Sequence, residues 1–368
     1  MTDSRARFLK WTNELLTPAS FPCRQRAAAH AWCAWGLKTL GVDEGDHAIW
    51  SGAFAADSVL ASGKAISPLN AARCVREYRR TAVFLQAMDE AICAAREKFP
   101  GETIQVLEAG CGPLAPLSLP FALRYAPDEV RFTLLDLHPP SLDGARAIAT
   151  ELGVNRSIRS FLAADATTVR LSAAERPHVI GCEVLLRALK REPQVAATLN
   201  LARQLRPGGF FLPEKIDVDA GLLNGEALQR RMIDGATMVP DARQELGRAF
   251  SLDAYAAAAL VPDAAGRLRG ARVAVPPHDP GREPLGLFTR IRVFREHKLG
   301  DFESSLNLPE RLRYPGELDA GGSVEFTYTI SSNPGLHLHA VQVAGESRCF
   351  DPVAARAAAG ERLPCSKR

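Results

Sequence analysis

Two glycines and a series of aspartates are the residues of this chain best suited to hold a ligand. The stretch VLEAGCGPLAPLSL, residues 106–119, begins as a buried strand and turns on Gly110 and Gly112, which let a ligand approach the main chain. Asp136 ends a second apolar run, FTLLDL, and Asp165 follows a third in FLAADA. A carboxylate at a strand tip can accept both hydroxyls of a ribose, and another can accept from an adenine amino group. Together these residues predict an adenosine-bearing ligand.

Each feature also has an ordinary explanation, since glycines make tight turns and an aspartate after a strand often caps a helix. Leu114 stands where nucleotide loops carry a small residue, and the GxGxxG pyrophosphate signature is absent. A nicotinamide cofactor and S-adenosylmethionine both suit the carboxylates. The segments EAGCG, LLDLHP and AADA resemble class I S-adenosylmethionine-dependent methyltransferases, where an acidic residue two before the first glycine is typical. The resemblance implies cofactor contacts from Glu108, Gly110, Gly112, Asp136, Leu137, Asp165 and Ala166.

The segment REYRRTAVFLQAM, before the glycine turn, resembles a helix of the protein arginine methyltransferases. In that family an arginine of an Arg-Thr pair binds the carboxylate of the cofactor's methionine part, and here the match is Arg80 followed by Thr81. A guanidinium suits this task because it binds a carboxylate in a bidentate way. The alternative is that Arg76, Arg79 and Arg80 form the solvated face of an amphipathic helix.

Two glutamates nine positions apart, Glu183 and Glu192, follow the fourth apolar run. The same spacing in the arginine methyltransferases holds the substrate guanidinium, so the resemblance implies that both are catalytic and that Glu183 also contacts the cofactor. Two carboxylates can orient a guanidinium and favour a lone pair on the attacking nitrogen. Glu192 lies in the polar context KREP, which also fits a solvated loop.

The chain departs from that family around these glutamates. Val184, Leu185 and Leu186 replace the family's aromatic and glycine residues, and its Thr-His-Trp loop has no counterpart in this sequence. A peptidyl arginine is therefore a doubtful acceptor, and a small natural-product-type molecule with an amine, guanidine or carboxylate is as good a candidate.

The elements that must position these residues follow from hydrophobic periodicity. Residues 1–99 have helical spacing, and the clearest helix runs from a Ser67 cap through Pro68 to a stop at Pro100. Short apolar runs then alternate with helical stretches, which predicts a parallel sheet covered on both faces. The expected strands are 104–107, 132–137, 158–162, 179–182 and 210–213.

This pattern predicts an α/β fold with three parts. Residues 1–99 are expected to form an N-terminal helical lid region and residues 100–220 a Rossmann-like domain, which the methyltransferase resemblance implies is S-adenosylmethionine-binding. Residues 221–368 form a C-terminal β-rich domain with a helical arm at about 225–260, and strands are expected at 285–299, 322–331 and 335–343. The family carries a dimerisation arm at this place, so a homodimer is plausible.

Bulk properties exclude several classes. The 368 residues carry a formal net charge of +3 and no dense run of Lys or Arg, so no nucleic-acid partner is expected. No apolar run could span or anchor in a membrane, and no signal peptide is expected at the start. The eight cysteines form no CxxC pair, which indicates reduced thiols and a cytoplasmic protein. His337 and His339 could share a strand face, but no third ligand is evident, so no metal is expected.

Three functions are compatible with the sequence. The leading hypothesis is methyl transfer from S-adenosylmethionine to a nitrogen or oxygen of a small molecule. In the second, an S-adenosylmethionine-cleaving cyclase closes a small azetidine-type ring and releases methylthioadenosine. In the third, the chain is a non-catalytic S-adenosylmethionine-binding module.

Overall fold

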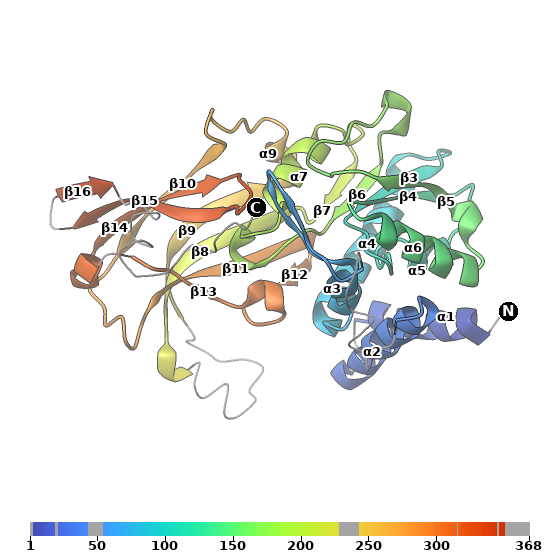
Figure 1. Ribbon diagram of the computed structural model, residues 1–368, viewed down its shortest axis with the longest axis horizontal. Coiled ribbons are helices and arrows are strands. Elements are labelled where there is room, and N and C mark those ends of the chain that lie inside the picture. The colour runs from blue at the N-terminus through green and yellow to red at the C-terminus, as the bar shows by residue number, and fades with distance from the viewer. Residues whose placement is uncertain are drawn as a thin grey trace, which may run out of the picture.

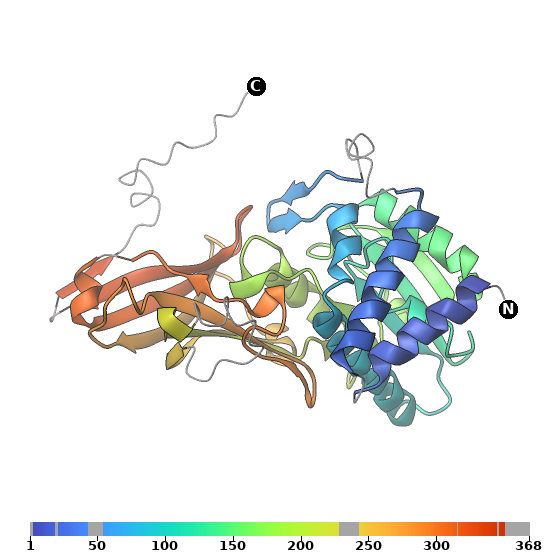
Figure 2. The same cartoon turned by 90° about the horizontal axis from the view of Figure 1, so that it is seen from below.

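One end of the molecule consists of a parallel sheet with its helices, and the other end consists of antiparallel strands (Figures 1 and 2). This architecture confirms the predicted α/β fold with N-terminal helices and a β-rich C-terminal region. Within the described residues, no helix is long and apolar enough to cross a membrane. The computed structural model describes residues 3–18, 21–42, 54–227, 243–314, 316–343 and 346–349.

Five parallel strands form the sheet that carries the glycine turn. Their order is β5-β4-β3-β6-β7, so the chain builds outward from β3 on one side and then starts again at β6 on the other. The tips of β3 and β6 are therefore adjacent at the point where the strand order reverses, which is where α/β sheets bind ligands. All five expected strands are confirmed to within two residues. They are β3 (Ile104–Ala109), β4 (Val130–Asp136), β5 (Ile158–Ala163), β6 (Val179–Cys182) and β7 (Phe210–Leu212).

Both faces of this sheet are buried, as the continuous apolar runs predict. Val106 and Leu134 point into a core shared with α4, α5 and α6. Leu107 and Leu135, one residue further along each strand, point into a second core shared with α7 and α9. The helices are α4 (Tyr78–Lys98), α5 (Leu119–Ala122), α6 (Pro139–Glu151), α7 (Gln194–Ala202) and α9 (Ala254–Ala257).

Helices α1 (Asp3–Leu16) and α2 (Pro22–Thr39) pack on α4, α5 and α6. The Phe8 and Trp32 rings meet edge to face with centroids 4.9 Å apart at the centre of this contact. Gly36 brings α2 close to the loop after β3, because a Cβ there would lie 2.4 Å from Leu114 Cδ2. The N-terminal helices thus support the glycine loop from behind.

The helix expected from Ser67 onward is divided in two. Helix α3 (Pro68–Cys74) begins at Ser67, whose hydroxyl accepts a hydrogen bond from the Asn70 amide at 3.3 Å, as predicted. The chain then bends before α4, and the Thr81 hydroxyl stabilises the bend by donating to the Val75 carbonyl at 2.9 Å. The bend places the first turn of α4, with Arg80, at the ligand edge of the sheet.

A short hairpin, β1 (Ser58–Leu60) and β2 (Gly63–Ala65), precedes α3 and has no counterpart among the expected elements. In Figures 1 and 2 it is the blue pair of strands that reaches from the parallel-sheet end toward the C-terminal β part. Gly63 adopts a φ of 144°, and a Cβ there would lie 2.9 Å from the Arg191 carbonyl oxygen. Glycine is therefore required for the hairpin to approach this backbone.

The C-terminal part consists of two antiparallel sheets. The first has the order β12-β11-β8-β9 with β13 beside β11, and the second has the order β10-β14-β15-β16. The antiparallel pairing begins with β8, so the boundary expected at residue 220 falls inside that strand. The strands are β8 (Lys215–Leu223), β9 (Arg243–Asp253), β10 (Arg267–Val275), β11 (Leu285–Phe294), β12 (His297–Leu299), β13 (Glu310–Arg311), β14 (Gly322–Thr329), β15 (Gly335–Val343) and β16 (Glu346–Cys349).

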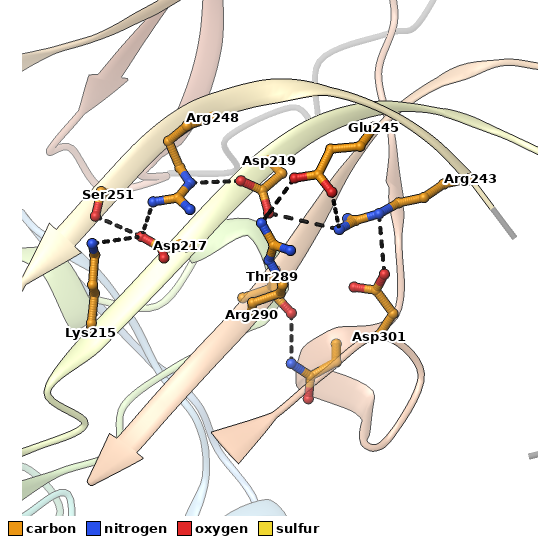
Figure 3. Close-up of polar contacts among 11 residues, drawn as sticks. Lys215, Asp217, Asp219, Arg243, Glu245, Arg248, Ser251, Thr289, Arg290 and Asp301 are labelled. Atoms are coloured by element: carbon orange, nitrogen blue, oxygen red, sulfur yellow. Dashed lines mark hydrogen bonds and ion pairs between the residues drawn. The ribbon is translucent and has the colours of Figure 1, made fainter. Parts of the chain in front are cut away.

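The expected helical arm at about 225–260 is wrong for most of its described length. Residues 243–253 form strand β9, and only the four residues of α9 are helical after it. Residues 228–242 of the expected arm lie outside the described residues. Charged residues of β9 pair across the sheet, so their sequence lacks the apolar alternation of an ordinary strand. Figure 3 shows one such pair, Arg248 of β9 with Asp219 of β8, at 2.6 Å.

Candidate active site

A cavity opens at the carboxyl ends of β3, β4, β5 and β6, and every site residue predicted from the sequence lines it. The cavity thus combines residues that the resemblance assigned to the cofactor with both glutamates assigned to the acceptor. They are Arg80, Glu108, Gly110, Gly112, Asp136, Leu137, Asp165, Ala166, Glu183 and Glu192.

The glycine turn forms the floor of the cavity. Gly110 and Gly112 have φ values of 78° and 57°, the left-handed region that side chains disfavour. A Cβ on Gly110 would lie 2.4 Å from Val184 Cγ1, so the two loops could not approach each other with a larger residue. A Cβ on Gly112 would lie 3.1 Å from Ala71 Cβ, so packing and backbone conformation both favour glycine at these two positions.

Asp136 ends β4 and is fixed by this turn. Its Oδ2 accepts from the Gly112 amide at 2.9 Å, and its Oδ1 accepts from the His138 amide at 2.8 Å. A carboxylate has about four acceptor positions, so two stay free for a ligand. Asp165 follows β5, and its Oδ1 accepts from the Thr167 amide at 2.8 Å. The backbone thus orients both carboxylates at neighbouring strand tips.

Arg80 and Glu183 form a buried ion pair at the centre of the cavity. Arg80 Nη2 donates to Glu183 Oε2, and Arg80 Nη1 lies 3.6 Å from Glu77 Oε1. Burial lowers the pKa of Arg80, but Glu183, Cys74 and Glu77 together raise it more, so the net shift is upward. Burial raises the pKa of Glu183, which the Arg80 charge opposes. The solvated-face alternative for Arg80 is therefore excluded.

Glu183 keeps one oxygen for a ligand. Its Oε1 is buried and has no hydrogen-bond partner among the described residues. Gln194 of α7 fixes the backbone on both sides of Glu183. Its side chain accepts from the Val184 amide at 3.0 Å and donates to the Cys182 carbonyl at 3.1 Å. The orphaned oxygen makes the cavity suited to an N–H or O–H donor.

Glu192 also faces the cavity, so the solvated-loop alternative for it is wrong. Burial, and then the neighbouring Glu183 carboxylate, raise the pKa of Glu192 to about 7. A carboxyl group with such a pKa can exchange a proton near neutral pH.

Glu108 is the most enclosed of these carboxyl groups, with 2% of its surface exposed. Its Oε1 accepts from the Leu117 amide at 3.0 Å, and its Oε2 has no partner among the described residues. Burial raises its pKa to about 8. It therefore stabilises the glycine loop and also presents an oxygen to the cavity.

Three groups of lining residues were not predicted. The hairpin contributes Leu60 and Lys64, and the loop after β12 contributes Ser305 and Leu306. The third is Glu77, whose carboxylate accepts from the Ser305 amide and hydroxyl at 2.8 and 2.6 Å. The sequence does contain a signal for Glu77, because Glu77 is an acidic residue three positions before Arg80. Nothing local marks the others, because contacts distant in sequence bring them to the cavity.

The hairpin covers the cavity and is attached at three points. The Lys64 amide donates to the Arg191 carbonyl at 2.7 Å, Ser58 Oγ lies 3.0 Å from His138 Nε2, and the Ser62 hydroxyl donates to Thr167 at 3.3 Å. These partners lie next to Glu192, Asp136 and Asp165 in the fold. No described residue of α1 or α2 lines the cavity, whereas Leu60 and Lys64 of the same N-terminal region do, so the lid role of residues 1–99 stays a prediction.

The cavity carries an excess of carboxylates. Its described lining has Arg80 and Lys64 as the permanently basic side chains. An unbalanced set of buried carboxylates favours a cationic guest or takes up protons. The carboxylates are Glu77, Glu108, Asp136, Asp165, Glu183 and Glu192.

The sheet order, the glycine turn and the carboxylates at successive strand tips are those of the class I methyltransferase fold, here joined to a C-terminal β part. No family model and no curated protein matches the sequence. Solved structures do match. One is a chain of the Trypanosoma brucei PRMT1 enzyme–prozyme heterotetrameric complex with AdoHcy, at TM-score 0.50 and 17% identity, covering 76% of this chain and 96% of that one. Another is PRMT6, at TM-score 0.53 and 12% identity, covering 74% of this chain and 98% of that one. The chain therefore has the fold of the arginine methyltransferases.

Proposed function

We propose that this protein is an S-adenosylmethionine-dependent methyltransferase that acts on a nitrogen or oxygen of a small molecule. The observation that carries the proposal is the buried Arg80–Glu183 pair, because it lies in the same cavity as the glycine turn, the strand-tip aspartates and Glu192. The pair joins the part suited to a nucleoside to the part suited to an acceptor.

The residues present fit S-adenosylmethionine. Gly110 and Gly112 line the cavity, and Asp136 and Asp165 offer acceptors for the ribose hydroxyls and the adenine amino group. Arg80 offers a buried cation for the carboxylate. When bound, S-adenosylmethionine supplies a methyl group on a positively charged sulfur, which the excess of carboxylates favours. The AdoHcy in the trypanosomal complex supports this assignment by analogy of fold.

Glu183 and Glu192 would bind the acceptor. Each carboxylate can accept an N–H or O–H bond from the acceptor and so orient its lone pair. Glu192, with its pKa of about 7, is suited to take up the proton that the acceptor loses. Glu183 is better suited to orientation, since its Oε2 is already bound to Arg80.

The surroundings of the acceptor end support a small molecule. The hairpin lies over the cavity, and Leu185, Leu186 and Leu306 give it apolar walls. A roof attached at three points limits access for a folded protein substrate and excludes water, which would compete with the acceptor.

Product analysis tests this proposal. The protein is incubated with S-adenosylmethionine and a panel of amines, guanidines and an arginine peptide, and the nucleoside products are separated. Acceptor-dependent formation of S-adenosylhomocysteine supports methyl transfer. Acceptor-independent methylthioadenosine would support the cyclase instead. Binding of S-adenosylhomocysteine without any product from the panel would favour the non-catalytic module.

A cytoplasmic homodimer belongs to the same proposal. The expected arm at residues 225–260 does not support it, because residues 243–253 form strand β9, and the support is the assembly of a protein with the same fold. The trypanosomal PRMT1 structure is a heterotetrameric complex. Sedimentation equilibrium of the purified chain measures its mass, and a value equal to one chain would contradict the dimer.

A further inference from the structure

The segment that leads to Glu192 has an unusual backbone. Ala188, Leu189 and Arg191 have φ values of 55°, 55° and 67°, and none of them is glycine. Side chains disfavour this left-handed region, so residues remain there only where the surroundings determine their conformation. Three such residues within four positions lie directly before a carboxylate of the cavity. The question is which contacts hold them.

The C-terminal β part supplies those contacts. The Thr289 hydroxyl accepts from the Ala188 amide at 2.7 Å, and the Tyr328 hydroxyl donates to the Leu189 carbonyl at 2.9 Å. Glu310 binds Arg187 Nε at 3.0 Å and also pairs with Lys190. The Pro334 carbonyl accepts from the Arg191 amide at 2.8 Å. Every residue from 187 to 191 is thus held by a group from residues 289–334.

These holding groups are themselves rigid. Tyr328 is buried and stacks on Phe250, with ring centroids 5.3 Å apart and planes 19° from parallel. The carbonyl of Thr289, a fully buried residue, accepts from the Asn307 amide group at 2.7 Å. Neither Tyr328, Thr289 nor Glu310 lines the cavity.

A network of charged residues around the buried Asp219 stiffens the sheet that carries Thr289. Figure 3 shows Asp219 of β8 between arginines of neighbouring strands, with Arg290 of β11 at 2.6 Å and Arg248 of β9 at 2.6 Å. The Asp219 side chain is 1% exposed, so loss of a partner would leave a buried charge. Networks of this kind fix the relative positions of strands.

We infer that the C-terminal β part positions Glu192 for the acceptor, with Tyr328, Thr289 and Glu310 as positioning residues. This inference rests on the proposed function, because it assigns the acceptor role to Glu192. The β part holds residues 187–191 in a conformation in which Ala188, Leu189 and Arg191 are left-handed and which directs Glu192 into the cavity. Glu183 is held directly by β6, Gln194 and Arg80, and the β part reaches that side indirectly, through the Ser305–Glu77 hydrogen bonds.

Hydrogen exchange tests the mechanical part of the inference without any catalysis. Tyr328→Phe keeps the ring and removes the donor to Leu189. Amides of residues 187–192 should then exchange about tenfold faster, while those of the glycine turn at 106–119 stay unchanged. The matched control is Tyr125→Phe, whose hydroxyl contacts Asp89 at 3.5 Å in the helical part. Unchanged exchange at 187–192 in a folded Tyr328→Phe protein would overturn the inference.

A double-mutant cycle tests whether Tyr328 acts through Glu192. Tyr328→Phe should lower turnover about tenfold in the wild-type background, but less than about twofold when Glu192 is already Gln. Calorimetric affinity for S-adenosylhomocysteine should stay the same in all four proteins. Equal losses in both backgrounds would mean a general structural role and would contradict the inference.

A second variant covers the case in which Tyr328→Phe does not fold. Glu310→Gln, at a half-buried position, removes the charge that holds Arg187 and Lys190 and should raise exchange at 187–192 in the same way, with exposed Glu296→Gln as control. Wild-type protein that neither binds S-adenosylhomocysteine nor forms a nucleoside product would refute the proposed function. The exchange of residues 187–192 would still decide separately whether the β part holds them.

Discussion

The two glutamates of the cavity differ in what holds them. Glu183 follows β6 directly, and parallel-sheet elements fix it through Gln194 and Arg80. Glu192 lies nine residues later at the end of a strained segment that Thr289, Tyr328 and other groups of the C-terminal part hold. The half of the site proposed for the nucleoside is therefore held mainly by the parallel-sheet part, whereas the half proposed for the acceptor depends on the C-terminal β part.

Both halves contain residues with a left-handed backbone conformation, but the residue types differ. The nucleoside half uses Gly110 and Gly112, which adopt it without strain. The acceptor half uses Ala188, Leu189 and Arg191, each at a cost of about 1–2 kcal/mol. External hydrogen bonds must offset that cost, which explains why so many converge on one short segment.

The largest expected effect is the loss of ligand binding when Arg80, in the half held by the parallel-sheet part, is replaced. Arg80→Ala leaves the buried Glu183 without its counter-charge, which typically costs about 3–5 kcal/mol of stability. It should abolish measurable binding of S-adenosylhomocysteine but weaken methylthioadenosine, which has no carboxylate, much less. Calorimetry with both ligands on the folded variant measures this difference.

The neighbouring Arg79→Ala is the matched control, since Arg79 is exposed and pairs with Glu303 at the surface. It should leave both affinities unchanged. Equal losses of both ligands in Arg80→Ala would mean that Arg80 acts through folding and not through the ligand's carboxylate.

The next effect compares the two glutamates directly. Glu183→Gln should lower turnover about 100-fold, close to 2.7 kcal/mol of barrier, because it removes an orienting charge at the centre of the site. Glu192→Gln should lower it about tenfold, because other acceptors can take up the proton more slowly. Both variants should keep most of their S-adenosylhomocysteine affinity, as calorimetry would show. Full turnover in Glu183→Gln would refute its acceptor role, and full turnover in Glu192→Gln would refute the base role.

The same division separates what the sequence could predict from what it could not. The five parallel strands followed from continuous apolar runs, and the sheet then brought the glycines and aspartates to one edge. Arg80 needed only the bend before α4 in addition. These features depend on residues near one another in sequence, so their pattern carries the information.

The acceptor half was less predictable because it forms through distant contacts. Glu192 lies in a polar stretch whose burial comes from the hairpin and the C-terminal β part. The sequence predicts a helix where strand β9 lies, because the charged residues of β9 interrupt the apolar alternation of a strand. In the structure Asp217 and Asp219 of the adjacent strand neutralise its Arg248. Neither the pairing of a charge nor the strain of a loop is visible in the local sequence.

A third pair of variants tests the backbone argument. Gly110→Ala should cost about 2–3 kcal/mol of unfolding free energy, because its Cβ would lie 2.4 Å from Val184 Cγ1 at a disfavoured φ. Ala188→Gly should change stability by less than about 1 kcal/mol, because relief of strain offsets the added freedom of the unfolded chain. Chemical denaturation of both proteins measures the two values. A large loss in Ala188→Gly would show that the segment is not strained.

The last effect is the pH dependence of stability that Glu192 contributes. Its pKa in the folded protein is about 7, above the ordinary value of 4.5, so the folded state binds more protons between these two values. The free energy of unfolding therefore falls as pH rises from about 4.5 to about 7, by at most about 3 kcal/mol from this group, because each pKa unit corresponds to about 1.4 kcal/mol. Glu192→Gln removes the group and should become more stable relative to wild type across that window. Glu108, with a pKa of about 8, adds a fall of the same sign in both proteins, so the difference between them isolates Glu192. The exposed Glu296→Gln serves as control and should show no such trend.

The fall of the unfolding free energy with pH should also be smaller in Tyr328→Phe, because a released segment lets Glu192 reach water and recover its ordinary pKa. A slope that stays the same in Tyr328→Phe would mean that the parallel-sheet half alone holds Glu192, and the contrast between the two glutamates would be lost.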